Sequence, residues 1–118
     1  MKEVGVRFAG IINENGKLIA GGFKPGVVPY AKDKEKFQRF LTRVIDVSLG
    51  SEHDEALGRL NYLTARRDKL VLISFPFPVS KIILLVSAEP IVDIEKLASR
   101  VSEIFSDSKL FSDWDLSS

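Results

Sequence analysis

The stretch Asp68–Glu89, DKLVLISFPFPVSKIILLVSAE, decides the fold. Two nearly continuous apolar runs, Leu70–Phe77 and Ile82–Val86, are separated by a short break that contains proline and serine. Strands that are apolar on both faces belong in the middle of a sheet that other elements cover on each side. Because Pro76 and Pro78 cannot donate to a ladder, we expect pairing to fail near them and the chain to turn there. The sequence therefore predicts a central hairpin.

Alternate residues of these two runs point to opposite faces of the predicted hairpin. One face is expected to carry Val71, Ile73, Phe75, Ile82, Leu84 and Val86. The other is expected to carry Leu70, Leu72, Ser74, Ile83, Leu85 and Ser87.

A second hairpin is predicted for Val4–Phe23, with its turn at Glu14–Lys17, because Asn15-Gly16 can take positive φ at both turn positions. Its first strand is expected to place Val4, Val6, Phe8 and Ile12 on one face, and Ala9 and Ile11 on the other. Gly21-Gly22 weakens the second strand, so the chain bends there or something approaches its backbone closely. A helix packed on the glycine surface or a ligand would explain such an approach.

Helical spacing of apolar residues predicts two helices, Asp33–Leu49 and Asp93–Phe105. The first has a stripe of Phe37, Phe40, Leu41, Val44, Ile45 and Ser48, and the second a stripe of Ile94, Leu97, Ala98, Val101, Ile104 and Phe105. Gly50 is expected to be a left-handed stop for the first helix. Val47 and Leu49 lie off its stripe, which leaves more apolar surface than one sheet face needs.

The segment Arg59–Arg66 alternates well enough to be an edge strand, with Leu60, Tyr62 and Thr64 on one side and Asn61, Leu63 and Ala65 on the other. Charged flanks suit an edge, since charge discourages uncontrolled pairing. Four cations, Arg59, Arg66, Arg67 and Lys69, form a basic rim that is solvated or meets phosphate or acidic protein.

One polar cluster, Ser51–Glu55, contains the single histidine. His53 between carboxylates has no second nitrogen ligand, so we expect no metal site. Ser51 followed by Asp54 instead resembles a weak capping box for a short turn. Nucleotide-binding, nucleophile-elbow and metal motifs are also absent from the sequence.

Length and amino-acid composition limit the classes of protein to which the chain can belong. A chain of 118 residues is one domain by size, taken here as residues 1–106 with a tail, 107–118, that is either disordered or docked. Near-balanced charge (17 basic and 16 acidic residues) makes nucleic acid an unlikely partner. Cysteine is absent, no apolar run approaches the ~20 residues of a membrane span, and no signal peptide is evident. A cytoplasmic protein is expected.

The order ββ-α-βββ-α resembles the roadblock/LC7 superfamily. The segments GIINENGKLIAGGF, NYLTARRDKLVLISFPF and KIILLVSAEP carry the resemblance, which covers Val4–Phe105. It implies an α+β fold of profilin-like architecture, in which a five-stranded antiparallel sheet has helices packed on its faces. The chain departs from the pattern at the front, where roadblock proteins usually carry an extra helix. It is also similar to small uncharacterised archaeal proteins.

The resemblance implies association rather than catalysis, with no cofactor or metal. Roadblock domains pair as dimers by continuing the sheet across an edge and packing their middle helices, and many are platforms for small GTPases or motors. We expect a homodimer, with a partner surface made of Val47, Leu49, Arg59, Asn61, Leu63 and Arg66. The alternative is a PAS-like sensor, in which Gly21-Gly22 and Phe75 with Phe77 wall a small-molecule pocket.

Overall fold

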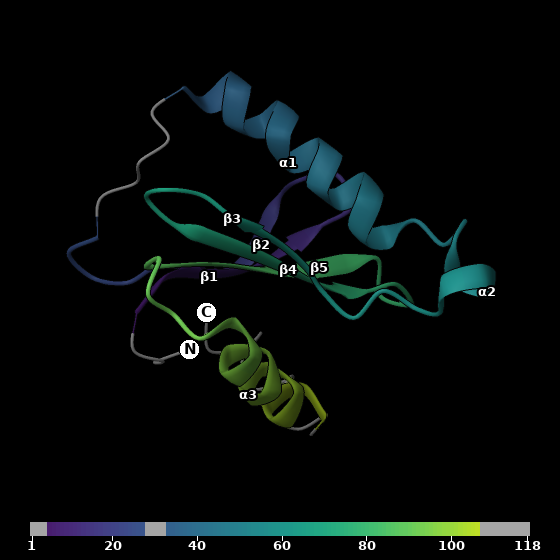
Figure 1. The fold of residues 1–118 in the computed structure, drawn as a ribbon. Coiled ribbons are helices and arrows are strands. Elements are labelled where there is room, and N and C mark those ends of the chain that lie inside the picture. The colour runs from purple at the N-terminus through teal and green to yellow at the C-terminus, as the bar shows by residue number, and fades with distance from the viewer. Residues whose placement is uncertain (1–4, 28–32, 107–118) are drawn as a thin grey trace.

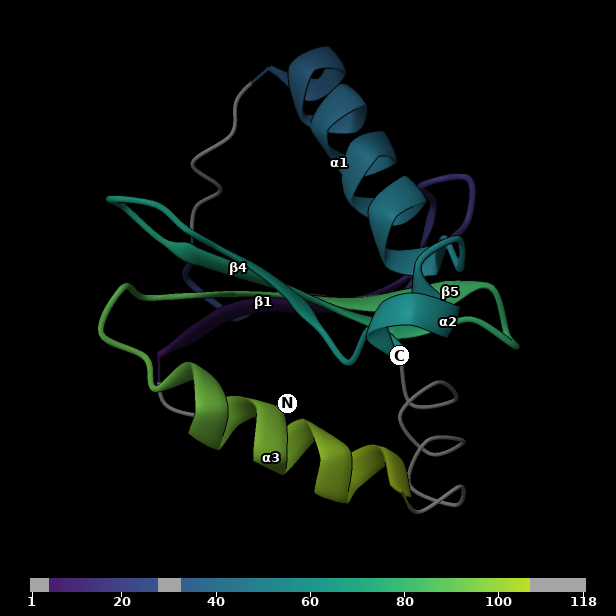
Figure 2. The ribbon, with the colours of Figure 1, turned by 45° about the vertical axis from the view of Figure 1, so that its right-hand side comes forward.

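The computed structural model describes residues 5–27 and 33–106. Its elements are β1 (Val6–Asn13), β2 (Leu18–Phe23), α1 (Lys34–Leu49), α2 (Asp54–Leu57), β3 (Leu63–Arg66), β4 (Val71–Phe77), β5 (Ile82–Ala88) and α3 (Ile94–Ser106). The strands form one antiparallel sheet in the order β2-β1-β5-β4-β3. Helix α1 lies over one face and α3 over the other, with the sheet between them (Figures 1 and 2). The predicted α+β fold with a five-stranded antiparallel sheet is confirmed.

The β4–β5 hairpin occupies the middle of the sheet together with β1. Its two faces divide as the alternation predicts. Toward α3, the core contains Val71, Ile73, Phe75, Leu84 and Val86, and toward α1 it contains Ile83 and Leu85 with Leu72 packed against them. Both strands are therefore covered on each side, which is why both of their faces are apolar.

Pro76 does not interrupt this hairpin, which corrects the prediction made from the two prolines. Pairing continues through Pro76↔Ile83 to Phe77↔Ile82, and the turn begins only at Pro78. The reason lies on the other side of β4, where pairing with β3 ends at Ser74. Pro76 therefore lies beyond the end of β3, where a missing donor leaves no neighbouring acceptor unsatisfied.

The β1–β2 hairpin is confirmed, but its turn differs from the prediction. The turn runs from Asn13 to Gly16, whose amide donates to the Asn13 carbonyl over 3.0 Å. Only Gly16 takes positive φ, +85°, while the Asn13 side chain accepts from the amides of Asn15 and Lys17. Asn13 thus stabilises the turn through side-chain hydrogen bonds, and Asn15 does not adopt the predicted left-handed backbone conformation.

An irregularity in β1 overturns part of the predicted face assignment. The register with β5 shifts between Val6 and Phe8. Because of this shift, Val6 joins Ala9 and Ile11 in the core toward α3, whereas Phe8 packs toward α1. Val4, which the sequence placed beside them, lies outside the described residues.

Glycine at position 21 is required by the close approach of β1. Gly21 has φ +88°, and a Cβ there would lie 2.2 Å from the Ala9 carbonyl oxygen. The neighbouring backbone, rather than a packed helix, therefore explains this glycine. Gly50 is also not the left-handed stop that the sequence suggested: its φ is −70°, and its amide donates to the Asp46 carbonyl.

Both long helices begin where the sequence places them. Asp33 caps α1 by accepting from the Lys36 amide, and Asp93 accepts from the Lys96 amide in the same way. Leu41, Ile45 and Ser48 of the predicted α1 stripe are buried, whereas Phe37, Phe40 and Val44 are only partly buried. In Figure 2 the N-terminal end of α1 stands farther from the sheet than its C-terminal end. The helix therefore covers its face of the sheet unevenly.

We expect Leu84→Asp to abolish cooperative folding. Leu84 is 0% exposed, and burying an unpaired carboxylate costs several kcal/mol against a total stability of ~5–15 kcal/mol. Thermal unfolding followed by circular dichroism measures the loss. Val79→Asp is the control, because Val79 is 99% exposed in the β4–β5 turn. A cooperative transition in Leu84→Asp like that of the control would contradict the assignment of this core.

We expect Gly21→Ala to destabilise the protein more than Gly26→Ala does. Both glycines have a similar positive φ, +88° and +81°, which costs alanine about 1–2 kcal/mol at each site. Only Gly21 adds a clash with β1, since a Cβ at Gly26 meets nothing within 4 Å. Urea unfolding of the two variants isolates that clash, and equal midpoints would show that β1 does not press on Gly21.

Candidate functional site

The predicted association strand is shorter in the structure. Strand β3 contains only Leu63–Arg66, so Arg59 and Asn61 lie in the exposed segment that leads into it. The prediction of a strand from Arg59 is therefore wrong. It is right that β3 lies at an edge of the sheet, because among the described strands β3 pairs with β4 alone. Leu63 and Ala65 pair with Ser74 and Leu72, which places them on the α1 side.

The two helix residues of the predicted surface have different environments. Val47 is 57% exposed and lies outside the core. Leu49, by contrast, is partly buried and packs against the core that α1 covers. It belongs to the interior contact of α1 rather than to a free surface, since the last turn of the helix lies close to the sheet.

A hydrogen bond anchors this last turn of α1. The hydroxyl of Ser48 lies 2.8 Å from that of Ser74 in β4, and both residues are 2% exposed. Each buried hydroxyl thus satisfies the other. The bond joins α1 to the central hairpin at a point near the C-terminus of the helix.

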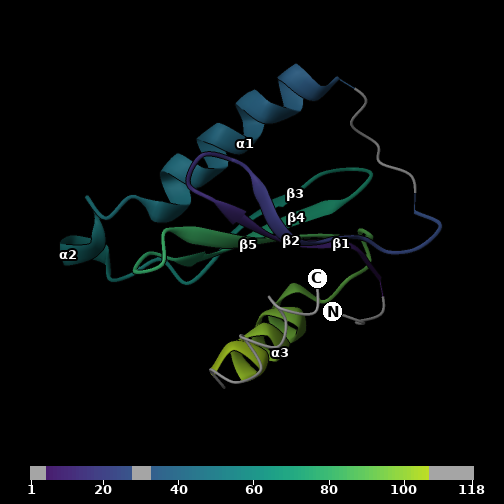
Figure 3. The ribbon, with the colours of Figure 1, turned by 180° about the vertical axis from the view of Figure 1, so that it is seen from behind.

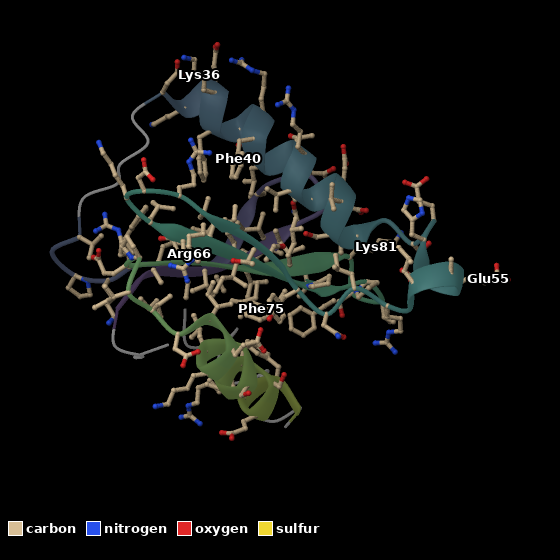
Figure 4. All side chains as sticks on the ribbon, in the orientation of Figure 1. Lys36, Phe40, Glu55, Arg66, Phe75 and Lys81 are labelled. Carbon is tan, nitrogen blue, oxygen red and sulfur yellow. The ribbon has the colours of Figure 1, made fainter. Side chains whose placement is uncertain are left out.

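Toward its N-terminus, α1 and the sheet leave a partly open cleft of ≈ 930 Å³. Phe37 and Phe40 line it from the helix, and Phe8, Phe23, Leu72 and Leu85 line it from the sheet. Figure 4 shows Phe40 between the helix and the sheet, whereas Lys36 points away. This cleft was not predicted from the sequence, although Phe8 on the first strand and Phe37 and Phe40 on the first long helix were its signal.

The pocket predicted for a PAS-like sensor is wrong. Phe75 is buried on the opposite face, beside Tyr62, and the ring of Phe77 packs at a tilt against that of Phe105 in α3, 5.4 Å between centroids. Figure 4 shows Phe75 on the side of the sheet that faces α3. Gly21 lies on β2, which β1 and β5 separate from β4. These residues cannot enclose one cavity.

The predicted basic rim divides into two parts. Arg66, Arg67 and Lys69 lie at the β3–β4 connection and line one end of the cleft, together with Asp68. Arg59 precedes β3 and does not line the cleft. The Arg66 guanidinium donates to the carbonyl oxygen of Pro90, which ties β3 to the segment before α3. The four cations therefore do not form a continuous patch for a polyanion.

Residues 51–57 form no metal site in the structure. His53 is exposed, its nearest carboxylate is Glu52 at 3.9 Å, and α2 has no side-chain cap, so the predicted capping box is wrong. Across residues 5–27 and 33–106, no three metal-binding side chains gather. Within the same residues no helix has the length and apolar character to cross a bilayer.

Tyr62 links the segment before β3 to α3. Its ring lies 5.8 Å from that of Phe75, and its hydroxyl donates to the Glu95 carboxylate. This hydrogen bond, with smaller contributions from burial and from the Glu95 charge, raises the pKa of Tyr62. The bond holds the predicted association segment against the body of the domain (Figure 3 shows α3 from behind).

The arrangement of these elements is a roadblock-like α+β fold. A crystal structure of a Roadblock/LC7 domain from Streptomyces avermitilis is similar to this chain, with a TM-score of 0.54 and 14% sequence identity. The match covers 80% of this chain and 75% of that one. At this identity the likeness shows the fold alone.

The family to which this chain belongs is shown by the match of its sequence to a family model. The model of a family of unknown function, DUF6659, matches residues 1–116, and the chain belongs to that family. No curated protein sequence matches the chain. The resemblance to small archaeal proteins has no support in these comparisons.

We expect Tyr62→Phe to lower stability at neutral pH and to matter less in alkali. A raised folded-state pKa means that the folded state holds the phenol proton more tightly than the unfolded chain does. The stabilisation is complete below the unfolded pKa of ~10 and is lost as the pH rises through the folded value. Urea unfolding of both proteins between about pH 8 and about pH 11 checks this, because the difference should narrow. A constant difference would show that the hydroxyl does not donate to Glu95.

Proposed function

We propose that this protein is a non-enzymatic association module that pairs with a second copy of itself through β3 and the outward face of α1. The observation that carries the proposal is the position of β3 at the sheet edge, where no described strand pairs with the outer side of Leu63–Arg66. An antiparallel neighbour there would continue the sheet from one copy into the next. The roadblock-like fold, which is typical of protein-interaction modules, supports this reading.

The helix contributes the apolar part of the proposed contact. Within α1, which the structure describes in full, Val47 is the large hydrophobic residue that remains mostly exposed. Arg43, four residues before Val47, lies on the same helical face, and Asp46, three residues after Arg43, lies beside that face. Two copies related by a two-fold axis can therefore place each acid opposite the other copy's base while their valines meet.

Because β3 is short, the proposed dimer depends on a contribution from α1. Four residues of β3 offer few backbone hydrogen bonds, so contact between the two α1 helices must provide much of the free energy of association. A dimer joined at β3 would leave β2 at both outer edges, where Leu18, Ile19 and Phe23 are each nearly half exposed. That edge would stay open to a further regulatory protein, such as the small GTPase that the resemblance implies.

We expect light scattering at micromolar concentration to give twice the chain mass of 13.2 kDa. Val47→Glu should give the mass of one chain with an unchanged circular dichroism spectrum, because a carboxylate is costly to bury in an apolar contact. Val79→Glu, in the exposed β4–β5 turn, is the matched control and should remain dimeric.

A charge exchange makes the test specific for α1. Asp46→Arg should weaken the dimer by placing like charges together, and adding Arg43→Asp should restore it. A wild-type mass near that of one chain overturns the proposal. If none of these substitutions changes the mass of the dimer, the placement of the contact on α1 is overturned.

A further inference from the structure

The cleft between α1 and the sheet shares Arg66 with the proposed dimer contact but lies mostly outside that contact, and it is large. Its volume of ≈ 930 Å³ lies near the top of the range of roughly 300–1,000 Å³ that is typical of small-molecule sites. It lies on the inner side of α1, whereas Val47 is on the exposed side. The cleft therefore needs an explanation beyond association.

Two aromatic pairs form the apolar part of the cleft. Phe8 and Phe23 lie side by side on neighbouring strands with their centroids 4.9 Å apart. Phe37 and Phe40 form the second pair on α1, at 6.1 Å. Phe23 is still 45% exposed, so an apolar ligand laid between the helix and the sheet would remove aromatic surface from water.

The charged lining residues gather at one end of the cleft. In the sheet register, Arg66 pairs with Val71, Val71 with Ala88, and Ala88 with Val6, so the β3–β4 connection lies at the same end of the sheet as the start of β1. Arg67 and Lys69 therefore lie at the same end as Arg7.

The opposite end of the cleft is apolar. Ile12 lines it five residues farther along β1 than Arg7, about 16 Å away by strand rise. Ile12 pairs with Ile83 and is only 3% exposed. Leu85, 2% exposed, lies two residues from Ile83 on the same face of β5. The site is thus apolar along its length and cationic at one end.

The cationic side chains at this end of the cleft are not equally available to a ligand. Arg7 pairs with Glu89 at 3.3 Å, and the guanidinium of Arg66 donates to the Pro90 carbonyl. Arg67 and Lys69 have exposed side chains, and among the described residues that line the cleft Asp68 is the one acid. The balance at the cationic end is positive, so it favours an anion.

We propose that the cleft binds an amphipathic carboxylate, an apolar chain with a single carboxylate at its end. The chain lies between the phenylalanine pairs of α1 and the sheet, and the carboxylate accepts hydrogen bonds from Arg67 and Lys69. A neutral ligand of the same shape would leave these donors in water, and a cationic one would be repelled. This inference does not depend on the proposed dimer, because both walls of the cleft belong to one chain.

Isothermal titration with three probes of one chain length tests the proposal: dodecanoate and dodecyltrimethylammonium, each below its micelle concentration, and dodecanol below its solubility limit. Dodecanoate should bind once per chain. Dodecanol should bind about tenfold more weakly or worse, because it lacks the charge-assisted hydrogen bonds. The cation should bind more weakly still. Equal affinity for all three probes overturns the proposal.

Substitutions at either end of β4 and in α1 test whether dodecanoate binds in this cleft. Lys69→Glu should reduce dodecanoate affinity about tenfold or more, whereas Lys81→Glu, a matched change at the opposite turn of β4, should leave it unchanged. Phe40→Gln should weaken all three probes, and if this variant fails to fold, the lysine pair still decides. Equal effects of the two lysine substitutions overturn the proposed site.

Repeating the titration with Val47→Glu separates this inference from the proposed function. Dodecanoate binding should be the same in the variant as in the wild type, whatever the mass of either. If binding appears only in a monomeric Val47→Glu, a second copy fills the cleft in the wild type and the carboxylate proposal is overturned.

Discussion

The rest of the structure depends on one constraint, that β4 and β5 are apolar on both faces. Neither strand can leave a face in water, so each face of the sheet needs a cover. Helix α3 covers one with Leu97, Ala98 and Val101, and α1 covers the other with Leu41 and Ile45. The layered fold follows from this requirement.

The two covers are not equivalent. Helix α3 contributes to one continuous core, and Tyr62 ties it to the segment before β3. Helix α1 is fixed near its C-terminus by the hydrogen bond between Ser48 and Ser74, and it leaves Phe37 and Phe40 lining a cleft. The face covered by α1 is therefore where the molecule combines a stable interior with a concave apolar surface.

Local sequence patterns predicted the elements well because they report burial directly. The alternation in β4 and β5 placed Val71, Ile73 and Phe75 on the correct face, and the spacing in α1 identified Leu41 and Ile45. The failures depended on neighbours in space. Pro76 is tolerated because β3 ends before it, and Val6 changes face because β1 shifts register against β5.

The candidate site was less predictable than the fold for the same reason. The amino-acid sequence identified the phenylalanines of α1 as apolar, but whether they meet the sheet or leave a gap depends on the angle of the helix. Likewise, Arg59 and Lys69 belong to one basic set in the sequence, yet only Lys69 lines the cleft. Tertiary arrangement decides these properties, and no local pattern encodes it.

We propose that a doubly covered β4–β5 pair supports a domain whose β3 edge pairs with a second copy. Amide hydrogen exchange of the full chain at two protein concentrations tests it most directly. We expect the amides of β5 to exchange slowest at both concentrations, while the protection of Leu63–Arg66 increases with protein concentration. Slow exchange in β5 with no change at β3 would contradict association through this edge, and fast exchange in β5 would contradict the organisation of the fold.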